Sequence, residues 1–333
     1  MRSRLCSAIA ALVCAALASP APAQTPRAGP PLDSLVIRLA NLSAVTGVED
    51  EMALELAAVL PLAQTDRAGN VVVIRGSGEP TRVAVCPMDE VGYVVGSITP
   101  EGYLTLRRVG TTFMGALYDQ FLEGQRVTVF GRRGALPGVV GVRSVHLTRG
   151  RPSAGEEPFN LDNAYVDVGA TSASAAEALG VDLLSPVTRE KRAHRYGTDL
   201  VAGLDVSARA SCAALLVATL RLSAGGGRGT TVAAFTRRRN LRWDGAAFVV
   251  MSHARGPAAG DLVMLGESAA PDSLGAGAVV ATRDSLPAAQ GFQAATAWSL
   301  PTRYARTPVE TVSLKDVAAL ADRLEAFLGG QRP

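Results

Sequence analysis

The chain has a small net charge, few lysines and few cysteines, and each scarcity narrows the class of protein. Its 333 residues carry a formal charge of only +3 and no long run of basic residues, so binding to nucleic acid has little electrostatic support. Only Lys191 and Lys315 are lysines among the 33 basic residues. A general preference for arginine is the plain explanation of that ratio, and it applies wherever an arginine is discussed below.

The first 23 residues have the pattern of an export signal. Arginines open the chain, residues 5–18 form an apolar run, and residues 21–23 provide small side chains for cleavage. The apolar run is too short to span a membrane. We therefore predict a signal peptide over residues 1–23, a linker over residues 24–32, and an exported protein, periplasmic or extracellular, without a membrane anchor.

Removal of this leader leaves Cys86 and Cys212 as the cysteines of the mature chain. Two cysteines cannot build a disulfide framework, and both lie in apolar stretches. We expect two small buried side chains, because free cysteine behaves as a small hydrophobic residue. A single disulfide between them is the alternative, since an exported chain meets an oxidising compartment.

Helical and strand patterns alternate in the two outer parts of the chain. Amphipathic or apolar helices are predicted over 33–42, with Asp33 as the cap, and over 49–60, 208–222 and 313–328. Strands are predicted over 70–75, 82–86, 92–98, 230–236 and 261–265. Between these parts, short β-type segments separated by Gly and Pro suit a small barrel: 103–107, 125–130, 136–142 and 165–168. The pattern predicts an α/β domain over 33–98 and 197–333, interrupted by a β-barrel-like domain over 99–196.

Six short motifs, in order along the chain, resemble those of one peptidase family. Residues 86–92 read C-P-M-D-E-V-G, which resembles A-H-M-D-E-V-G of the glutamyl/deblocking aminopeptidases, the dinuclear zinc exopeptidases that include the tetrahedral aminopeptidases. Residues 303–312 resemble the family's R-Y-x-H-S/T-P-V-E, and further matches lie at 66–70, 138–147, 166–181 and 308–317. The resemblance implies an α/β/α zinc-exopeptidase domain with an inserted β-barrel, two metal ions and homo-oligomers.

The same resemblance places different residues where the family holds its metals and its base. Pro87 and Arg306 stand at the positions of two ligand histidines. Residues 235–246 match the family segment that contains the general base and a ligand glutamate, and there Arg239 and Asn240 stand instead. Proline has no donor atom in its side chain, and arginine stays protonated, so it cannot take a proton from water. Three of the five expected protein ligands are therefore replaced, together with the base.

Three acids remain at family positions. Asp205 aligns with the carboxylate that bridges the metals, and Glu267 with a metal-binding aspartate. Asp89 matches the carboxylate that supports the first histidine. Ordinary structural roles are the alternatives: a helix cap for Asp205, and a backbone hydrogen bond at a strand end for Asp89. The chain's histidines, which we expect to lie on the surface or in packing positions, are His146, His194 and His253.

We therefore expect an exported aminopeptidase-family homologue that has lost zinc-dependent peptide hydrolysis. It would need no cofactor, and its partners would be peptides or further copies of itself. In this hypothesis the guanidinium groups of Arg239 and Arg306 replace the zinc ions and neutralise the remaining acids. One alternative is a divergent aminopeptidase that removes N-terminal residues with two zinc or cobalt ions. Another is an interaction protein whose pocket is filled by arginine side chains.

Overall fold

The computed structural model describes most of the chain after the predicted leader. The described residues are 31–110, 118–141, 159, 161–162, 164–222, 229–253, 261–268, 274–277, 279–282 and 294–330. The predicted signal peptide (1–23), the linker up to residue 30, and His146 lie outside these ranges.

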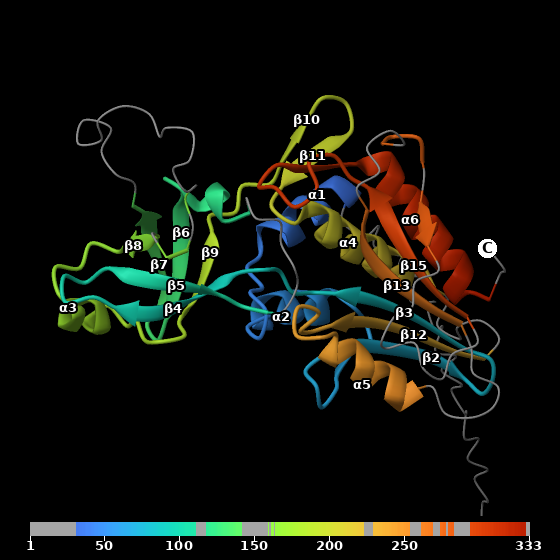
Figure 1. The fold of residues 1–333 in the computed structure, drawn as a ribbon. Coiled ribbons are helices and arrows are strands. Elements are labelled where there is room, and N and C mark those ends of the chain that lie inside the picture. Colours follow the sequence, from blue (N-terminus) through green and yellow to red (C-terminus); the bar gives the residue numbers. More distant parts are fainter. Residues whose placement is uncertain are drawn as a thin grey trace, which may run out of the picture.

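A seven-stranded sheet forms the centre of the larger domain (Figure 1). Its strands, in spatial order, are β1 (Gln64–Thr65), β2 (Val71–Ser77), β12 (Gly229–Thr236), β3 (Thr81–Pro87), β13 (Asp261–Ser268), β15 (Ala294–Pro301) and β14 (Val280–Thr282). The four central strands, from β12 to β15, pair in parallel. Because the carboxyl ends of parallel strands meet at one edge of a sheet, the segments after β3 and β12 are brought together there.

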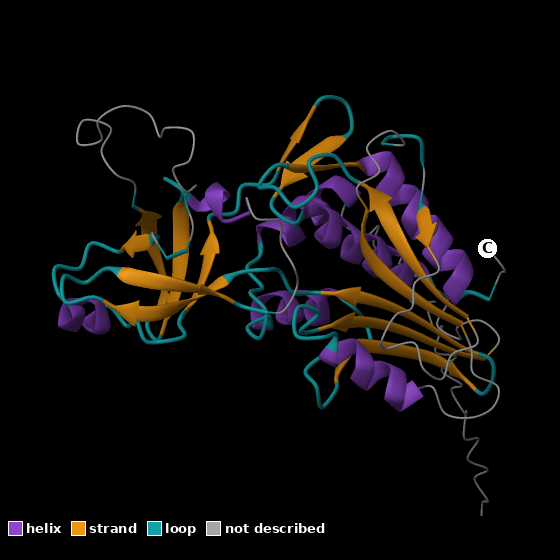
Figure 2. Cartoon of the chain, in the orientation of Figure 1, coloured by secondary structure: helices purple, strands orange, loops and turns teal. Residues whose placement is uncertain are grey.

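Helices cover both faces of this sheet (Figure 2). The larger core lies under α1 (Leu32–Asn41), α2 (Asp50–Val59), α4 (Val206–Arg221) and α6 (Leu314–Leu328). A smaller core lies under α5 (Asp244–His253) on the opposite face. Helix α4 is buried on nearly all sides, which explains why its sequence is apolar without a strong polar face. No helix among the described residues is long and apolar enough to cross a membrane.

Helix α1 begins one residue earlier than the sequence predicted. Its N-cap position is Pro31, whose ψ of 139° is extended, and Asp33 lies inside the first turn rather than at the cap. The prediction that Asp33 caps the helix was therefore wrong. Proline fixes φ near the helical value and has no N–H to leave unpaired, so it is tolerated where a helix begins. An acid in the first turn still interacts favourably with the helix dipole.

The second domain is a closed barrel, at the left in Figure 1. Its strands, in order around the barrel, are β4 (Tyr93–Ile98), β5 (Leu104–Arg108), β8 (Tyr165–Asp167), β7 (Gly134–Val140), β6 (Arg126–Gly131) and β9 (Pro186–Arg189). A single 3₁₀ turn, η1 (Tyr118–Leu122), and a short helix, α3 (Ala173–Ala178), pack on it. An α/β domain with a barrel inserted in it confirms the predicted fold class.

The division between the domains differs in detail from the predicted ranges. Strand β4 belongs to the barrel, because Tyr93 and Val95 point into the barrel core. The barrel therefore begins before residue 99. Strand β10 (His194–Tyr196) pairs with β11 (Leu200–Gly203), which pairs with β16 (Glu310–Ser313) in a small sheet of the larger domain.

Cys86 in β3 and Cys212 in α4 form a disulfide. Both residues are fully buried, as predicted, but they are not free thiols. Helix α4 packs against β3 so closely that the two Cα atoms lie 5.4 Å apart, which is within the usual range for a disulfide. The structure thus contains the single disulfide that was predicted as the alternative to two free cysteines.

Candidate functional site

The candidate site lies at the edge of the sheet where β3 and β12 end. Asp89 follows β3 and is 1% exposed. Its carboxylate accepts hydrogen bonds from the Thr46 hydroxyl at 2.8 Å and from the backbone N–H groups of Arg239 and Asn240 at 2.8 and 3.0 Å. Asp89 therefore holds the segment after β12 in place, which is the backbone role that was predicted as its alternative.

Asn240 is directed at Asp89. Its side-chain nitrogen donates to the Asp89 carboxylate at 3.1 Å and to the Thr46 hydroxyl at 2.9 Å, and the residue is fully buried. Gly110, after strand β5 of the barrel, passes so close that an added Cβ would lie 2.7 Å from the Cβ of Asn240. The barrel therefore covers this amide. A donor pointing at Asp89 occupies the place where the family resemblance expects a carboxylate ligand.

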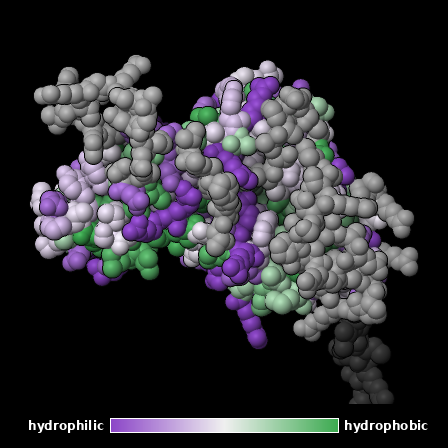
Figure 3. Space-filling view, viewed as in Figure 1, coloured by the Kyte–Doolittle hydropathy of each residue, from purple (hydrophilic) through white to green (hydrophobic). Residues whose placement is uncertain are grey.

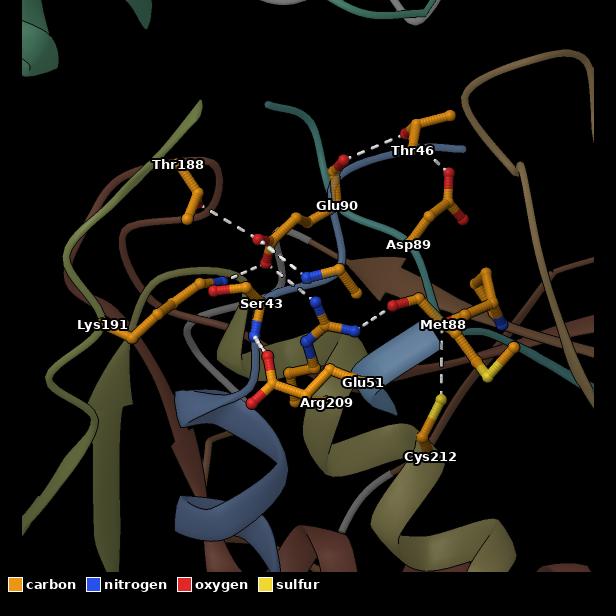
Figure 4. A network of polar contacts seen from close by, with 12 residues as sticks. Ser43, Thr46, Glu51, Met88, Asp89, Glu90, Thr188, Lys191, Arg209 and Cys212 are labelled. Carbon is orange, nitrogen blue, oxygen red and sulfur yellow. Dashed lines mark hydrogen bonds and ion pairs between the residues drawn. The ribbon is translucent and has the colours of Figure 1, made fainter. Parts of the chain in front are cut away.

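Glu90, the next residue, is the centre of a buried ion network (Figure 4). It is fully buried, and its carboxylate pairs with the guanidinium of Arg209 at 2.8 Å and with the ammonium of Lys191. The Thr188 hydroxyl and the Ala44 backbone N–H donate to its other oxygen at 3.2 and 3.3 Å. Burial alone would raise the pKa of Glu90, but the two cations outweigh it and lower the pKa to about 2. Glu90 is therefore ionised at every ordinary pH.

The two cations of this network come from different parts of the fold. Arg209 lies in α4, is fully buried, and also donates to the backbone carbonyl of Met88. Lys191 follows the last barrel strand, and burial lowers its pKa although Glu90 acts in the opposite direction. Sequence reasoning missed Glu90 and Lys191. The available signal was the position of Glu90 inside the C-P-M-D-E-V-G motif, next to Asp89.

Asp205 precedes α4 at a strained backbone position. Its φ is +52°, in the left-handed region, and its side chain makes no capping hydrogen bond to the helix. Asp205 therefore occupies the N-cap position that the alternative expected, but its side chain does not cap the helix. A non-glycine residue in that region costs on the order of 1 kcal/mol or more, and such positions cluster at functional sites. Burial is the main cause that raises the pKa of Tyr118, and the negative charge of Asp205 adds to it.

Glu310 ties the start of α4 to the loop that contains Arg306. Its buried carboxylate accepts from the Ser207 hydroxyl at 2.8 Å and from the Arg306 backbone N–H at 2.7 Å. Arg306 has a φ of +62° and is exposed, whereas Arg239 is half-buried. Sequence reasoning did not identify Glu310 as a site residue, although it lies in the P-V-E part of the second motif.

Glu49 adds another carboxylate to this region. It is fully buried, and one oxygen accepts from the backbone N–H groups of Gly47 and Arg238 at 2.8 and 3.1 Å. Its second oxygen has no hydrogen-bond partner among the described residues, although Arg237 Nη1 lies 3.9 Å away. Burial is the main cause that raises the pKa of Glu49, and the neighbouring Asp89 adds to it.

The donor groups at this edge do not fit a dinuclear metal site. Pro87 offers no side-chain donor, and the amide nitrogen of Asn240 points at Asp89, whose oxygens already accept hydrogen bonds. Within the part of the chain that the structure describes, no group of three or more His, Cys, Asp or Glu side chains is placed to hold a metal ion. His194 is exposed on β10, and His253 ends α5. The backbone of Glu267 pairs with Leu300 in the sheet, and its side chain lies outside the described atoms.

The surface between the two domains is polar, with one apolar cavity beside it. Figure 3 shows strongly hydrophilic side chains gathered between the barrel and the larger domain. A cavity of about 160 Å³ lies where the start of α2 meets the barrel. It is lined by Ser43, Val45, Val48, Asp50, Glu51, Phe130 and Pro186.

Comparisons with known proteins agree with this architecture. The sequence model of the M42 glutamyl aminopeptidases matches residues 69–290. A relative from Escherichia coli K12 named "Putative aminopeptidase SgcX" is 32% identical over 45% of this chain and 39% of its own length. A second, "Putative aminopeptidase FrvX" from the same strain, is 30% identical over 54% of this chain and 50% of its own length. The chain thus spans half or less of the curated relatives that it matches.

A solved structure matches over a longer range. The TET1 peptidase of Pyrococcus horikoshii, described as assembling into a tetrahedron or a large octahedral shell, superposes with a TM-score of 0.76. The match covers 90% of this chain and 100% of that one at 22% identity. At this identity the likeness establishes the shared fold.

Proposed function

This chain belongs to the M42 glutamyl aminopeptidase family, and we propose that it is an exported member that binds peptides without hydrolysing them. The observation that carries the proposal is the pair of buried hydrogen bonds from the side-chain nitrogen of Asn240 to Asp89 and Thr46. In the family this position holds a glutamate whose oxygens bind a metal ion. In this chain Asn240 directs an N–H group there, which cannot bind a metal ion.

The chemistry of zinc hydrolysis supports the loss of activity. A dinuclear site needs nitrogen and oxygen ligands that complete the coordination of both ions, and a base that takes a proton from the bound water. When bound, the two ions would lower the pKa of that water from ~16 toward ~7. Pro87 cannot ligate, Asn240 is a weak ligand, and Arg239 cannot act as the base. Asp205 and Glu267 alone cannot satisfy two ions.

Arginine side chains are our proposed replacement for the metals. Asp205, which is half-buried, and Glu267 align with carboxylates whose charge the family balances with metal ions, so cationic side chains at this edge would take over that balance. Arg239 and Arg306 stand at former site positions, and guanidinium groups form strong paired hydrogen bonds with carboxylates. The network of Glu90 with Arg209 and Lys191 is a precedent in this chain for acids held by cationic side chains.

The cavity beside α2 supports a peptide-binding role. An apolar cavity of about 150 Å³ in another protein is large enough to bind benzene. The cavity of about 160 Å³ lined by Val45, Val48 and Phe130 would therefore accept one apolar side chain. Export is supported by the leader-like residues 1–23 and by the disulfide, which persists in oxidising compartments. Self-association is proposed by analogy with the assembling TET1 peptidase.

A divergent metal-dependent aminopeptidase is the second candidate. It is favoured by the strained backbone of Asp205, because strain of this kind accumulates at working sites. In that case two zinc or cobalt ions would be held by Asp205, Glu267 and groups that the motif does not identify.

Metal analysis paired with an activity assay tests the proposal. The chain is purified without metal, loaded with zinc or cobalt, and assayed with aminoacyl-nitroanilides that carry acidic, basic and apolar residues. We expect less than one bound metal ion per chain and no EDTA-sensitive hydrolysis of these substrates. We also expect the chain to bind members of a peptide library. About two metal ions per chain and EDTA-sensitive turnover would overturn the proposal in favour of the enzyme. A quadruple variant, P87H/R239E/N240E/R306H, serves as the matched control in which metal binding is expected to increase.

A further inference from the structure

The end of the barrel that faces the larger domain contains a buried arginine whose hydrogen-bond donors are not all used. Arg189, the last residue of β9, is 5% exposed. Its terminal nitrogens, Nη1 and Nη2, have no hydrogen-bond partner among the described residues. Val187 lies two residues earlier on the same face of β9 and belongs to the barrel core. The side chain of Arg189 therefore extends from that core toward the mouth of the barrel.

Tyr118 covers this guanidinium from one side. The Cζ atom of Arg189 lies 4.8 Å from the centroid of the Tyr118 ring, within the range of a cation–π interaction. The hydroxyl of Tyr118 is also buried and has no hydrogen-bond partner in the described part of the chain. Burial raises the pKa of Tyr118, so the hydroxyl remains a neutral donor. The two terminal NH₂ groups of Arg189 and the hydroxyl of Tyr118 are thus neighbouring hydrogen-bond donors without an acceptor among the described residues.

The acids nearby are already engaged. Asp119, next to Tyr118, accepts from the Tyr93 hydroxyl at 3.2 Å and from the guanidinium of Arg108 at 2.5 Å. Glu90 is shared by Lys191 and Arg209. A guanidinium cannot lose its proton at ordinary pH, and a buried cation without a partner is costly. The charge of Asp205 also acts on Tyr118, but the terminal nitrogens of Arg189 make no hydrogen bond to Asp205, so these donors can bind an anion from outside the chain.

We propose that Arg189 and Tyr118 form a binding site for a carboxylate. The planar guanidinium would donate from Nη1 and Nη2 to the two carboxylate oxygens, the geometry in which this pair binds most strongly. The Tyr118 hydroxyl would donate to one of the same oxygens. A singly charged, planar ligand fits better than a phosphate dianion, because the surroundings are the apolar barrel core and the nearby charge of Asp205 repels a second negative charge.

The proposed carboxylate site lies next to the candidate functional site at the sheet edge, but its ligand binding does not depend on that site. The charges of both Asp205 and Glu90 act on Tyr118, so a bound carboxylate would lie beside the sheet edge described above. Both nitrogens of Arg189 are almost without exposed surface, so the ligand is enclosed once it is bound and we expect slow association. Binding does not require that the chain has lost or kept hydrolysis.

Thermal unfolding and calorimetry of the mature chain test the proposal. The probes are sodium acetate, compared with sodium chloride at equal ionic strength, and a tripeptide with a free C-terminal carboxylate, compared with its amide. The variants are Arg189→Met, Arg189→Lys and Tyr118→Phe. Arg107→Met is the matched control, because the Arg107 side chain on β5 is 68% exposed and pairs with an exposed acid.

We expect the wild-type chain and R107M to show a saturable rise in melting temperature with a carboxylate probe. R189M should lose that rise, and R189K and Y118F should bind on the order of tenfold more weakly. If R189M does not fold, weaker carboxylate binding by R189K and Y118F supports the site, and unchanged binding by both overturns it. Binding of the peptide acid but not the amide assigns the ligand to peptides, and binding of acetate alone assigns it to free small acids. No saturable response in the wild type, or an equal response in R189M, would overturn the site.

Discussion

Replacement of Glu90 by glutamine is the sharpest test of the ion network at the sheet edge. The substitution keeps the shape of the side chain but removes the charge that compensates Arg209 and Lys191, both of which are buried. Breaking a buried ion pair by removing one partner costs on the order of 3–5 kcal/mol. The exposed Glu190, one residue before Lys191, is the control, because its pairs with Arg126 and Arg192 are on the surface.

The pKa of Glu90 leads to a similar magnitude. Its pKa falls from an ordinary value of 4.5 to about 2 in the folded chain. One pKa unit corresponds to about 1.4 kcal/mol, so the folded state gains on the order of 3 kcal/mol from the ionised carboxylate. Because the folded pKa is the lower one, this contribution is complete above the unfolded pKa and is lost as the pH falls from about 4.5 toward about 2.

Urea unfolding, followed by circular dichroism at pH 7 and at several acidic pH values, measures both effects. We expect E90Q to lose about 3 kcal/mol at pH 7 and E190Q to leave the stability nearly unchanged, because its ion pairs lie on the surface. We also expect E90Q to lack the part of the acid sensitivity that belongs to Glu90. Equal stability of E90Q and E190Q at pH 7 would refute the reasoning, because it would mean that the two cations do not depend on Glu90.

Three further predictions concern other parts of the same edge. Asp89→Ala should lower the free energy of unfolding by about 2–4 kcal/mol, because it leaves the buried donors of Asn240 and of the backbone unsatisfied; urea unfolding measures this, and a change near zero would contradict it. Replacing Cys86 and Cys212 by alanine should cost about 2–5 kcal/mol, seen as a lower melting temperature that no longer responds to reductant. Glu49→Gln should make stability less sensitive to pH above about 4.5, because the raised pKa means that the wild type loses stability as the pH rises through it; parallel pH profiles of the two proteins would argue against that role.

The fold could be predicted from the sequence because its elements have strong local patterns. Helix α4 was expected over residues 208–222 and spans Val206–Arg221, and a strand expected over 82–86 spans Thr81–Pro87. The boundary between the domains was harder, because alternating apolar residues look the same in a barrel strand as in a half-buried strand of a sheet. Strand β4 therefore could not be assigned to the barrel by its own sequence.

Site residues that lie within a sequence motif could be predicted. Contacts between residues that are far apart in the chain could not. Asp89 and Asn240 were identified from two motifs, and the structure brings them together. Glu90 meets Lys191 and Arg209 across 101 and 119 positions of the chain, and no local pattern connects them. The pairing of Cys86 with Cys212 spans 126 positions and stayed open for the same reason.

The position of Glu90 has a consequence for motion between the domains. The chain enters the barrel through the residues between β3 and β4 and leaves it through the residues between β9 and β10. Glu90 lies on the entering segment and Lys191 on the returning one, and their contact clamps both crossings to α4 through Arg209. In a hinge motion, a few loop residues such as those at these crossings absorb the change in φ and ψ. This clamp should therefore restrict rotation of the barrel against the sheet, so that the width of the site between them changes little when a ligand arrives.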